Sequence, residues 1–212
     1  MAAGAYIRES QRLGLADVAD TTNTVFIPAY DQKIPQLHTK KKKELGLRTA
    51  RWALETLYGL DQIAWDDPIK MPEIAIQDGK IQLTFEIAVR PDDYSDVIEG
   101  FSIAGEDETF YMADAVYVEV KDKNERYKQI LVSSPLVKEP KYVRYAWSRA
   151  PMGNLKVNGM PWQPLFSFRT DTTPWPAEMS HMDPEGPAKN SAIIKELKAK
   201  AAEALKTRLD HR

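Results

Sequence analysis

The chain of 212 residues contains no cysteine. A protein without cysteine has no disulfide framework, no thiolate metal ligand and no cysteine nucleophile. An excess of charge of one sign is also absent, because 29 basic and 31 acidic side chains leave a formal net charge of −2. Nucleic acids and acidic membrane surfaces attract strongly basic proteins, so we expect neither as a partner.

Long hydrophobic runs are missing too. No stretch approaches the roughly 20 apolar residues that a membrane helix needs. The N-terminal stretch carries Arg8, Glu9 and Arg12 where a signal peptide would need an uninterrupted apolar segment. We therefore expect neither a signal peptide nor a membrane span. The sequence does not identify the cellular compartment.

Residues for metal or phosphate chemistry are few. The sequence has no phosphate-binding glycine loop, and its histidines lack the paired spacing of a metal site, so we expect no cofactor and no metal: His38, His181 and His211. Three acidic pairs lie in turn-like stretches and are typical of solvated loops rather than of a glycosidase site: Asp66-Asp67, Asp92-Asp93 and Glu106-Asp107.

What is present centres on the stretch from Thr24 to Gly59. Its pattern predicts a short buried strand at Val25 to Ile27, a loop at Pro28 to Leu37 and a helix at Lys41 to Tyr58 that ends at a glycine. His38 would then lie on a loop between a strand and a helix, where α/β hydrolytic folds can present a catalytic base. A single loop histidine beside lysines is ordinarily solvated, so this position alone assigns no chemistry.

The first 60 residues predict a helix, a strand and a helix, the first helix being at about Tyr6 to Leu15. One strand cannot form a sheet, so we interpret residues 1–60 as the last slice of an α/β domain. The second helix has an apolar face that should contact a neighbouring sheet or a partner chain, formed by Leu45, Ala50, Ala53, Leu54 and Leu57.

After Leu60 strand patterns follow one another. Glu73 to Gln77 and Lys80 to Val89 flank Asp78-Gly79, a signal for a type I′ hairpin because both central residues need positive φ. Further strands are predicted near Gly100 to Ala104, Thr109 to Met112, Ala115 to Lys121, Tyr127 to Ser133, Tyr142 to Ser148 and Leu165 to Arg169. Such short strands favour an antiparallel β-sandwich of jelly-roll type over residues 61–173.

The remaining residues, 174–212, begin with a proline-rich stretch that predicts a linker. Asn190 or Ser191 could cap a final helix that runs to about Leu209. The predicted fold class is therefore α+β, with an α/β remnant, a sandwich and a C-terminal helix. We expect this helix to pack on the sandwich rather than to bind a partner.

Five groups of residues occur in the order of the motifs of a known family. They are Ile7-Arg8-Glu9-Ser10-Gln11; His38, Lys42, Leu45-Gly46, Arg48, Ala50 and Trp52-Ala53-Leu54; Gly100 to Asp107; Val143 to Ser148 with Gly153-Asn154-Leu155; and Phe168-Arg169-Thr170-Asp171. The second group resembles the His-Pro-x-x-Lys-x-x-Val-Gly-x-Arg-Leu-Ala segment of the sialate O-acetylesterase family of SGNH-type hydrolases. The resemblance covers about residues 5 to 171.

The resemblance implies removal of acetyl groups from sugar hydroxyls by a serine mechanism with His38 as the base. The Gly-Gln-Ser-Asn block that carries the family's nucleophile is absent, so we expect the chain to be inactive unless an N-terminal hydrolase segment completes it. Gln36 and Thr39 stand where many members have aspartate and proline. Asp31 is the nearest acid upstream of His38 and could orient the imidazole. Family members are often exported.

The alternative is a non-catalytic β-sandwich module that binds carbohydrate or a partner chain. Tyr145 and Trp147 alternate on one predicted strand and could line a sugar platform, but packing in the core or at a domain interface fits the pattern better. If the esterase interpretation holds, the partners are an acetylated carbohydrate and a chain that covers the helix at 41–58.

Overall fold

The computed structural model of the protein describes residues 3–32, 42–60, 70–122, 125–149, 151–157 and 163–174. The chain divides into two compact units, Met1–Thr172 and Thr173–Arg212, and nearly all the described residues belong to the first. The helix predicted near Asn190 to Leu209 lies outside the described residues. The domain boundaries predicted at 60/61 and 173/174 stay predictions.

Two α-helices and a short 3-10 helix occupy the N-terminal part of the first unit: α1 (Ala3–Thr22), η1 (Tyr30–Gln32) and α2 (Lys42–Thr56). α1 is longer at both ends than predicted. α2 ends at Thr56 rather than at the predicted Tyr58, and the predicted glycine stop follows it: Gly59 adopts a φ of 66° and the Leu60 amide donates to the Leu54 carbonyl over 2.9 Å. This is the usual glycine stop, which a residue with a Cβ would make with strain.

The strand predicted at Val25 to Ile27 is wrong. Residues 24–29 have no regular structure, and no neighbouring strand pairs with them among the described residues. The apolar run is instead used for packing, since the Phe26 ring meets the Phe166 ring edge-on with centroids 5.0 Å apart. A short apolar run predicts burial, but it predicts a strand only where a partner strand is available.

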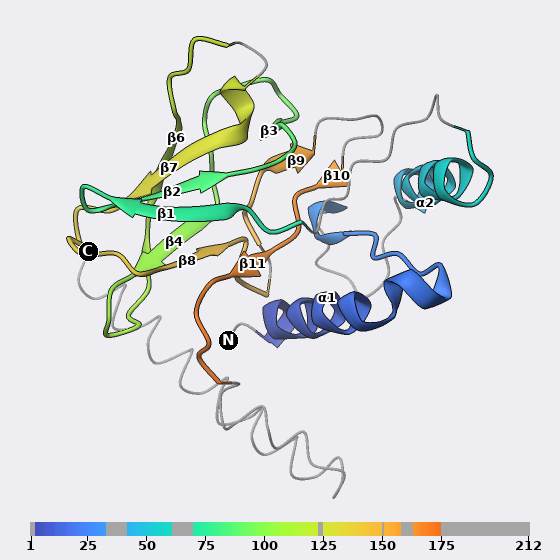
Figure 1. Cartoon of the computed structure of the whole chain (residues 1–212). Coiled ribbons are helices and arrows are strands. Elements are labelled where there is room, and N and C mark those ends of the chain that lie inside the picture. Colours follow the sequence, from blue (N-terminus) through green and yellow to red (C-terminus); the bar gives the residue numbers. More distant parts are fainter. Residues whose placement is uncertain are drawn as a thin grey trace, which may run out of the picture. The chain divides into compact units, whose positions relative to one another are not determined.

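Eleven short strands in the described residues form three antiparallel sheets, which confirms an α+β fold with mostly antiparallel sheets (Figure 1). The first sheet has the order β1 (Glu73–Gln77), β2 (Lys80–Thr84), β7 (Gln129–Ser133), β6 (Asp114–Tyr117). The second has the order β11 (Phe168–Arg169), β8 (Tyr142–Tyr145), β4 (Phe101–Ala104), β5 (Tyr111–Met112). The third contains β10 (Gln163–Pro164), β9 (Leu155–Val157) and β3 (Val89–Pro91).

The hairpin of β1 and β2 confirms the turn prediction. Gln77 pairs with Lys80, and Asp78 and Gly79 between them have φ values of 50° and 69°. The second strand ends at Thr84 rather than at Val89 as predicted, because Val89 belongs to β3 and pairs with Val157 of β9. The alternation of apolar and polar residues predicted extended strands, but it did not predict that the chain passes from the first sheet to the third between Thr84 and Val89.

All three sheets contribute to one hydrophobic core. Its fully buried members include Ile81, Leu83, Ile130 and Val132 from the first sheet, Phe101, Ile103, Val143 and Tyr145 from the second, and Val89 and Leu155 from the third. Burial of each such side chain contributes about 1.5–3 kcal/mol, so this core dominates the stability of the unit. A jelly-roll topology stays a prediction.

Candidate functional site

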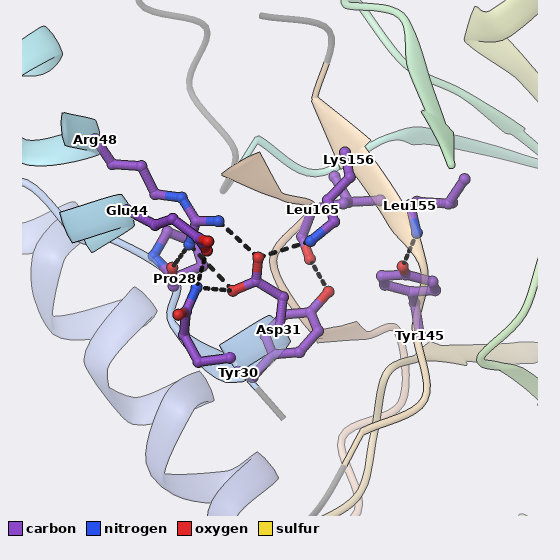
Figure 2. Close-up of polar contacts among 10 residues, drawn as sticks. Pro28, Tyr30, Asp31, Glu44, Arg48, Tyr145, Leu155, Lys156 and Leu165 are labelled. Carbon is purple, nitrogen blue, oxygen red and sulfur yellow. Dashed lines mark hydrogen bonds and ion pairs between the residues drawn. The ribbon is translucent and has the colours of Figure 1, made fainter. Parts of the chain in front are cut away.

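A buried ion-pair cluster around Asp31 joins the helices to the sheets (Figure 2). Arg48 of α2 donates from Nη2 to Asp31 Oδ2 over 2.6 Å and from Nη1 to Asp31 Oδ1 over 3.1 Å. Lys156 of β9 donates from Nζ to Asp31 Oδ2 over 2.6 Å. These three residues are called the Asp31 cluster below. The exposed fractions of their side chains are 9% for Asp31, 2% for Arg48 and 9% for Lys156, so the cluster is almost completely shielded from solvent.

The charge state of Asp31 follows from these contacts. Burial would raise the pKa of the Asp31 carboxyl, but the hydrogen bonds and positive charges of Arg48 and Lys156 outweigh it and hold the pKa below its usual range. Asp31 is therefore ionised at neutral pH. One carboxylate against two buried cations leaves the cluster with an excess of positive charge.

The cluster also joins η1 to α2, the two described elements that precede and follow residues 33–41, among which is His38. η1 ends at Gln32 and α2 begins at Lys42. Arg48 connects these two elements through Asp31 and through the Pro28 carbonyl, to which Nη1 donates over 2.9 Å. Gln32 Nε2 donates to Glu44 Oε2 over 2.9 Å and adds a further connection. The described residues before and after positions 33–41 are thus joined to each other, and Lys156 of β9 binds the same carboxylate.

Two tyrosines, the half-buried Tyr30 and the fully buried Tyr145, continue the polar network into the core (Figure 2). The Tyr30 hydroxyl donates to the Leu165 carbonyl, and the Tyr145 hydroxyl accepts from the Leu155 amide over 2.8 Å. Burial raises the pKa of Tyr30, to which the negative charge of Asp31 also contributes, and burial raises that of Tyr145. Both phenols therefore stay protonated at neutral pH and act as structural hydrogen-bonding groups.

Glycine is required beside Tyr145. A Cβ at Gly153 would lie 2.6 Å from the Tyr145 hydroxyl oxygen, and Gly100, with a φ of 99°, lies against the Gly153 backbone. The next residue, Asn154, donates to the Val97 carbonyl over 2.8 Å and accepts from the Glu99 amide over 2.9 Å. The Gly-Asn-Leu group in the sequence thus has a packing and a hydrogen-bonding reason.

Arg8 of α1 fastens this helix to β8, β11 and the residues beside them. Its guanidinium donates to Ser167 Oγ over 2.8 Å, to the Ala146 carbonyl over 3.1 Å and to the Ser148 carbonyl over 2.9 Å. Beside it, Arg144 makes two hydrogen bonds of 2.7 Å to Asp171. Motifs more than 100 residues apart in the sequence therefore meet in space, and their role here is to hold elements together.

The alternative role of Tyr145 and Trp147 as a sugar platform is wrong for Tyr145, which is 0% exposed. Trp147 is half-buried, and its ring meets Tyr6 of α1 edge-on at 5.3 Å. Packing in the core and against a helix, the preferred interpretation, is confirmed for this pair.

The two site residues predicted from sequence have different outcomes. Asp31 lies in the buried cluster, whereas His38 lies outside the described residues, so their partnership stays a prediction. Sequence reasoning missed Arg48 and Lys156 as the partners of Asp31. A signal existed, since Arg48 belongs to the group around His38 and Lys156 directly follows the Gly153-Asn154-Leu155 group.

The described part of the chain offers little for other chemistry. It contains no group of three side chains placed to hold a metal ion. In that same part, each helix is too short or too polar to cross a membrane.

Comparison with known proteins gives one informative likeness. No family model matches the chain. No curated protein matches it. Among solved structures it is similar to the carbohydrate acetylesterase XAC1771 from Xanthomonas citri, with a TM-score of 0.52 and 28% sequence identity. The match covers 65% of this chain and 30% of that protein, so the chain spans less than a third of its length. This likeness supports carbohydrate esterases in general and does not single out the sialate O-acetylesterases.

Proposed function

We propose that this chain is part of a carbohydrate esterase that hydrolyses O-acetyl esters of sugars. The observation that carries the proposal is the likeness to XAC1771, in which 28% identity accompanies a TM-score of 0.52 over 65% of the chain. The order of the sequence motifs supports the same assignment, and three of them are in contact, since Arg8 donates to the Ala146 and Ser148 carbonyls and Arg144 pairs with Asp171.

The finer form of the proposal is a sialate O-acetylesterase-like enzyme. Residues 1–60 would be the C-terminal slice of its SGNH domain, followed by a β-sandwich of jelly-roll type. The serine nucleophile would come from outside these 212 residues, and His38 would accept its proton as general base. The contacts of Asp31, Arg48 and Gln32 that join η1 to α2 support this role, because a base must be held within hydrogen-bond reach of its nucleophile.

Asp31 has two possible roles in this enzyme. As the acid of a triad it would accept a hydrogen bond from the His38 imidazole. Its oxygens already accept hydrogen bonds from Arg48, Lys156 and Gln32, so the imidazole would have to share or displace a donor. As a positioning residue it would join η1 to α2 on either side of residues 33–41, and another group would orient the His38 imidazole.

The partner surface proposed on α2 lies where its apolar side chains meet solvent. Leu45 and Leu54 are half-buried, while Ala50 and Leu57 are exposed. Tyr58, just beyond the helix, is 73% exposed. A hydrolase segment that supplies the serine would cover this face and so gain apolar burial on association.

The test is complementation. The full chain alone should hydrolyse p-nitrophenyl acetate no faster than free imidazole, because a base without a nucleophile has nothing to activate. Co-expression with the serine-bearing N-terminal segment of a homologous esterase should give a stable complex that hydrolyses acetylated sugars. In that complex His38→Ala should lower kcat by about 100-fold or more, while Met112→Ala on an exposed edge strand should leave it unchanged.

The second candidate is a non-catalytic module that binds carbohydrate or a partner chain. The observation that favours it is the exposure of Leu57 and Tyr58 at the end of α2, which offers an apolar surface to a partner chain. A tight complex that stays inactive with His38 intact would favour this candidate. A burst of serine-dependent turnover from the chain alone would contradict both.

A further inference from the structure

A second group of aromatic and charged side chains lies outside the Asp31 cluster, on the loop after β3. Tyr94 is 63% exposed and holds a φ of 62°, a left-handed conformation that costs a tyrosine free energy. Two hydrogen bonds fix this loop, from the Tyr94 amide to the Pro91 carbonyl over 3.2 Å and from the Ser95 amide to Asp93 Oδ1 over 3.0 Å. The chain therefore presents an aromatic ring to solvent on a fixed, strained turn.

Arg90 supports this ring from within the protein. Its guanidinium carbon lies 4.3 Å from the centroid of the Tyr94 ring and 5.4 Å from that of Tyr127. Tyr127 in turn meets Tyr117 edge-on at 5.1 Å, and the Tyr117 hydroxyl donates to the Val89 carbonyl over 2.9 Å. Three tyrosines and an arginine thus form one connected layer in which only Tyr94 is strongly exposed.

An open groove of about 480 Å³ continues from this layer and is within the size range of small-molecule sites. It is lined by Asp96, Arg126 and the stretch from Val116 to Val120, which includes Tyr117 and Glu119. Arg126 donates to Asp96 Oδ2 over 2.6 Å, and both side chains are about half exposed. The groove therefore combines an aromatic and aliphatic floor with carboxylate acceptors and guanidinium donors at its rim.

We propose that Tyr94 and this groove form a subsite for a neutral saccharide, separate from the ester-cleaving centre. A pyranose ring has an apolar C–H face that can lie on the Tyr94 ring, and hydroxyl groups that can bond to Asp96, Glu119 and Arg126. Such a subsite would hold a sugar chain while its acetyl groups are removed elsewhere. The ligand class rests on the proposed function, but none of the residues is shared with the proposed esterase site.

The charges of the groove select neutral over acidic sugars. Its rim carries the carboxylates of Asp96 and Glu119 against the single guanidinium of Arg126, which is already paired with Asp96. The loop that presents Tyr94 adds Asp92 and Asp93. An anionic sugar would meet the like charges of Asp96 and Glu119 in the described lining, where the guanidinium of Arg126 is already paired. A saccharide without charge meets only hydrogen-bonding partners.

The experiment is a binding titration of the full chain, labelled with ¹⁵N, by NMR. The probes are cellohexaose, xylohexaose and mannohexaose as neutral chains and 3′-sialyllactose as the anionic one. At least one neutral probe should shift the amides of Tyr94, Val118 and Glu119, and 3′-sialyllactose should not. Tyr94→Ala should weaken binding by about five- to tenfold, as expected for loss of one stacked ring, while Tyr94→Phe should keep it because the ring face remains.

Tyr58→Ala is the matched control, because Tyr58 is 73% exposed on a different element and should bind like the parent chain. The proposal is overturned if no neutral probe shifts the groove amides, if 3′-sialyllactose binds as tightly as the best neutral chain, or if Tyr94→Ala and Tyr58→Ala behave alike. Because binding is measured on the chain alone, loss of this subsite leaves the complementation assay of esterase activity untouched, and the two proposals can fail separately.

Discussion

Residues 3–60 and residues 70–171 belong to one compact unit but bury different kinds of side chain. In the sheet region the fully buried residues are mainly aliphatic and aromatic, as in the row formed by Ile81, Leu83, Ile130 and Val132. In the helical region the buried set includes Glu9, Gln32 and Arg48. The helical region meets the sheet region through the directed polar contacts of Arg8, Tyr30 and Asp31, in addition to the aromatic contacts of Tyr6 and Phe26.

This difference separates the interactions that stabilise the unit from those that orient its helices relative to its sheets. Apolar burial is non-directional and roughly proportional to area, so the sheets supply most of the stability. Buried charges and hydrogen bonds depend on geometry and carry a desolvation cost, so they contribute more to orientation than to stability. The Asp31 cluster lies where the two regions meet, since it joins η1 and α2 to β9.

The largest expected effect concerns the apolar core. Phe85 is 3% exposed and belongs to the core, so Phe85→Ala should lower the free energy of unfolding by about 3–5 kcal/mol. Its neighbour Glu86 is exposed and pairs with the exposed Lys70, so Glu86→Ala should change the free energy of unfolding by about 0.5 kcal/mol or less. Urea midpoints measure both. Equal shifts of the two urea midpoints would contradict the prediction that Phe85 is buried and Glu86 is exposed to solvent.

The next-largest expected effect concerns the Asp31 cluster. Asp31→Asn removes the anion but leaves Arg48 and Lys156 buried, so it should destabilise the chain by about 3 kcal/mol. The double variant Asp31→Asn with Lys156→Met removes one unpaired cation and should recover part of the loss. Glu106→Gln, which breaks the exposed pair with Lys141, is the control and should cost at most about 1 kcal/mol.

These variants also separate the two roles of Asp31 in the complemented enzyme. If Asp31 acts as a positioning residue, the double variant should recover stability and activity together. If Asp31 orients His38 directly, stability should return while kcat stays low. Thermal unfolding and kcat measured on the same three variants decide between these roles.

The sheet region could be predicted in large part because its signals are local. The Asp78-Gly79 turn and the alternation of Ile81 and Leu83 with polar residues required only neighbouring positions. β9 and β10 were missed because strands of three and two residues show no readable period, and Lys156 in β9 is buried although it is charged. The strand predicted at 25–27 failed since pairing depends on a partner strand that is absent among the described residues.

The candidate site could be predicted only in part. Asp31 was chosen for its nearness to His38 in sequence, and it does lie at the start of the segment that contains His38. Its ion-pair partners are 17 and 125 residues away, and such separations leave no periodic signal in a single sequence. Without those partners the sequence could not distinguish a carboxylate free to orient an imidazole from one engaged with two cations.

The smallest expected effect concerns Tyr30, which directly precedes Asp31. Burial raises the pKa of its hydroxyl, so the native state keeps the proton at a pH at which an unfolded tyrosine, with a pKa of about 10, loses it. The native state then binds more protons than the unfolded state, and stability falls as the pH rises above about 10. Tyr30→Phe removes this contribution, together with the hydrogen bond to the Leu165 carbonyl that is worth about 1 kcal/mol at neutral pH.

The variant should therefore be slightly less stable than the parent at pH 7, and its stability should decline less steeply between about pH 10 and pH 12. Urea unfolding across this range measures both quantities. Tyr58→Phe provides the control, because it removes a hydroxyl group from a side chain that is 73% exposed. If the free energies of unfolding of Tyr30→Phe and the parent fall in parallel as the pH rises, the Tyr30 hydroxyl is accessible to water. The surroundings of Tyr30 and the Asp31 cluster would then be more hydrated than the burial of Arg48 and Lys156 indicates.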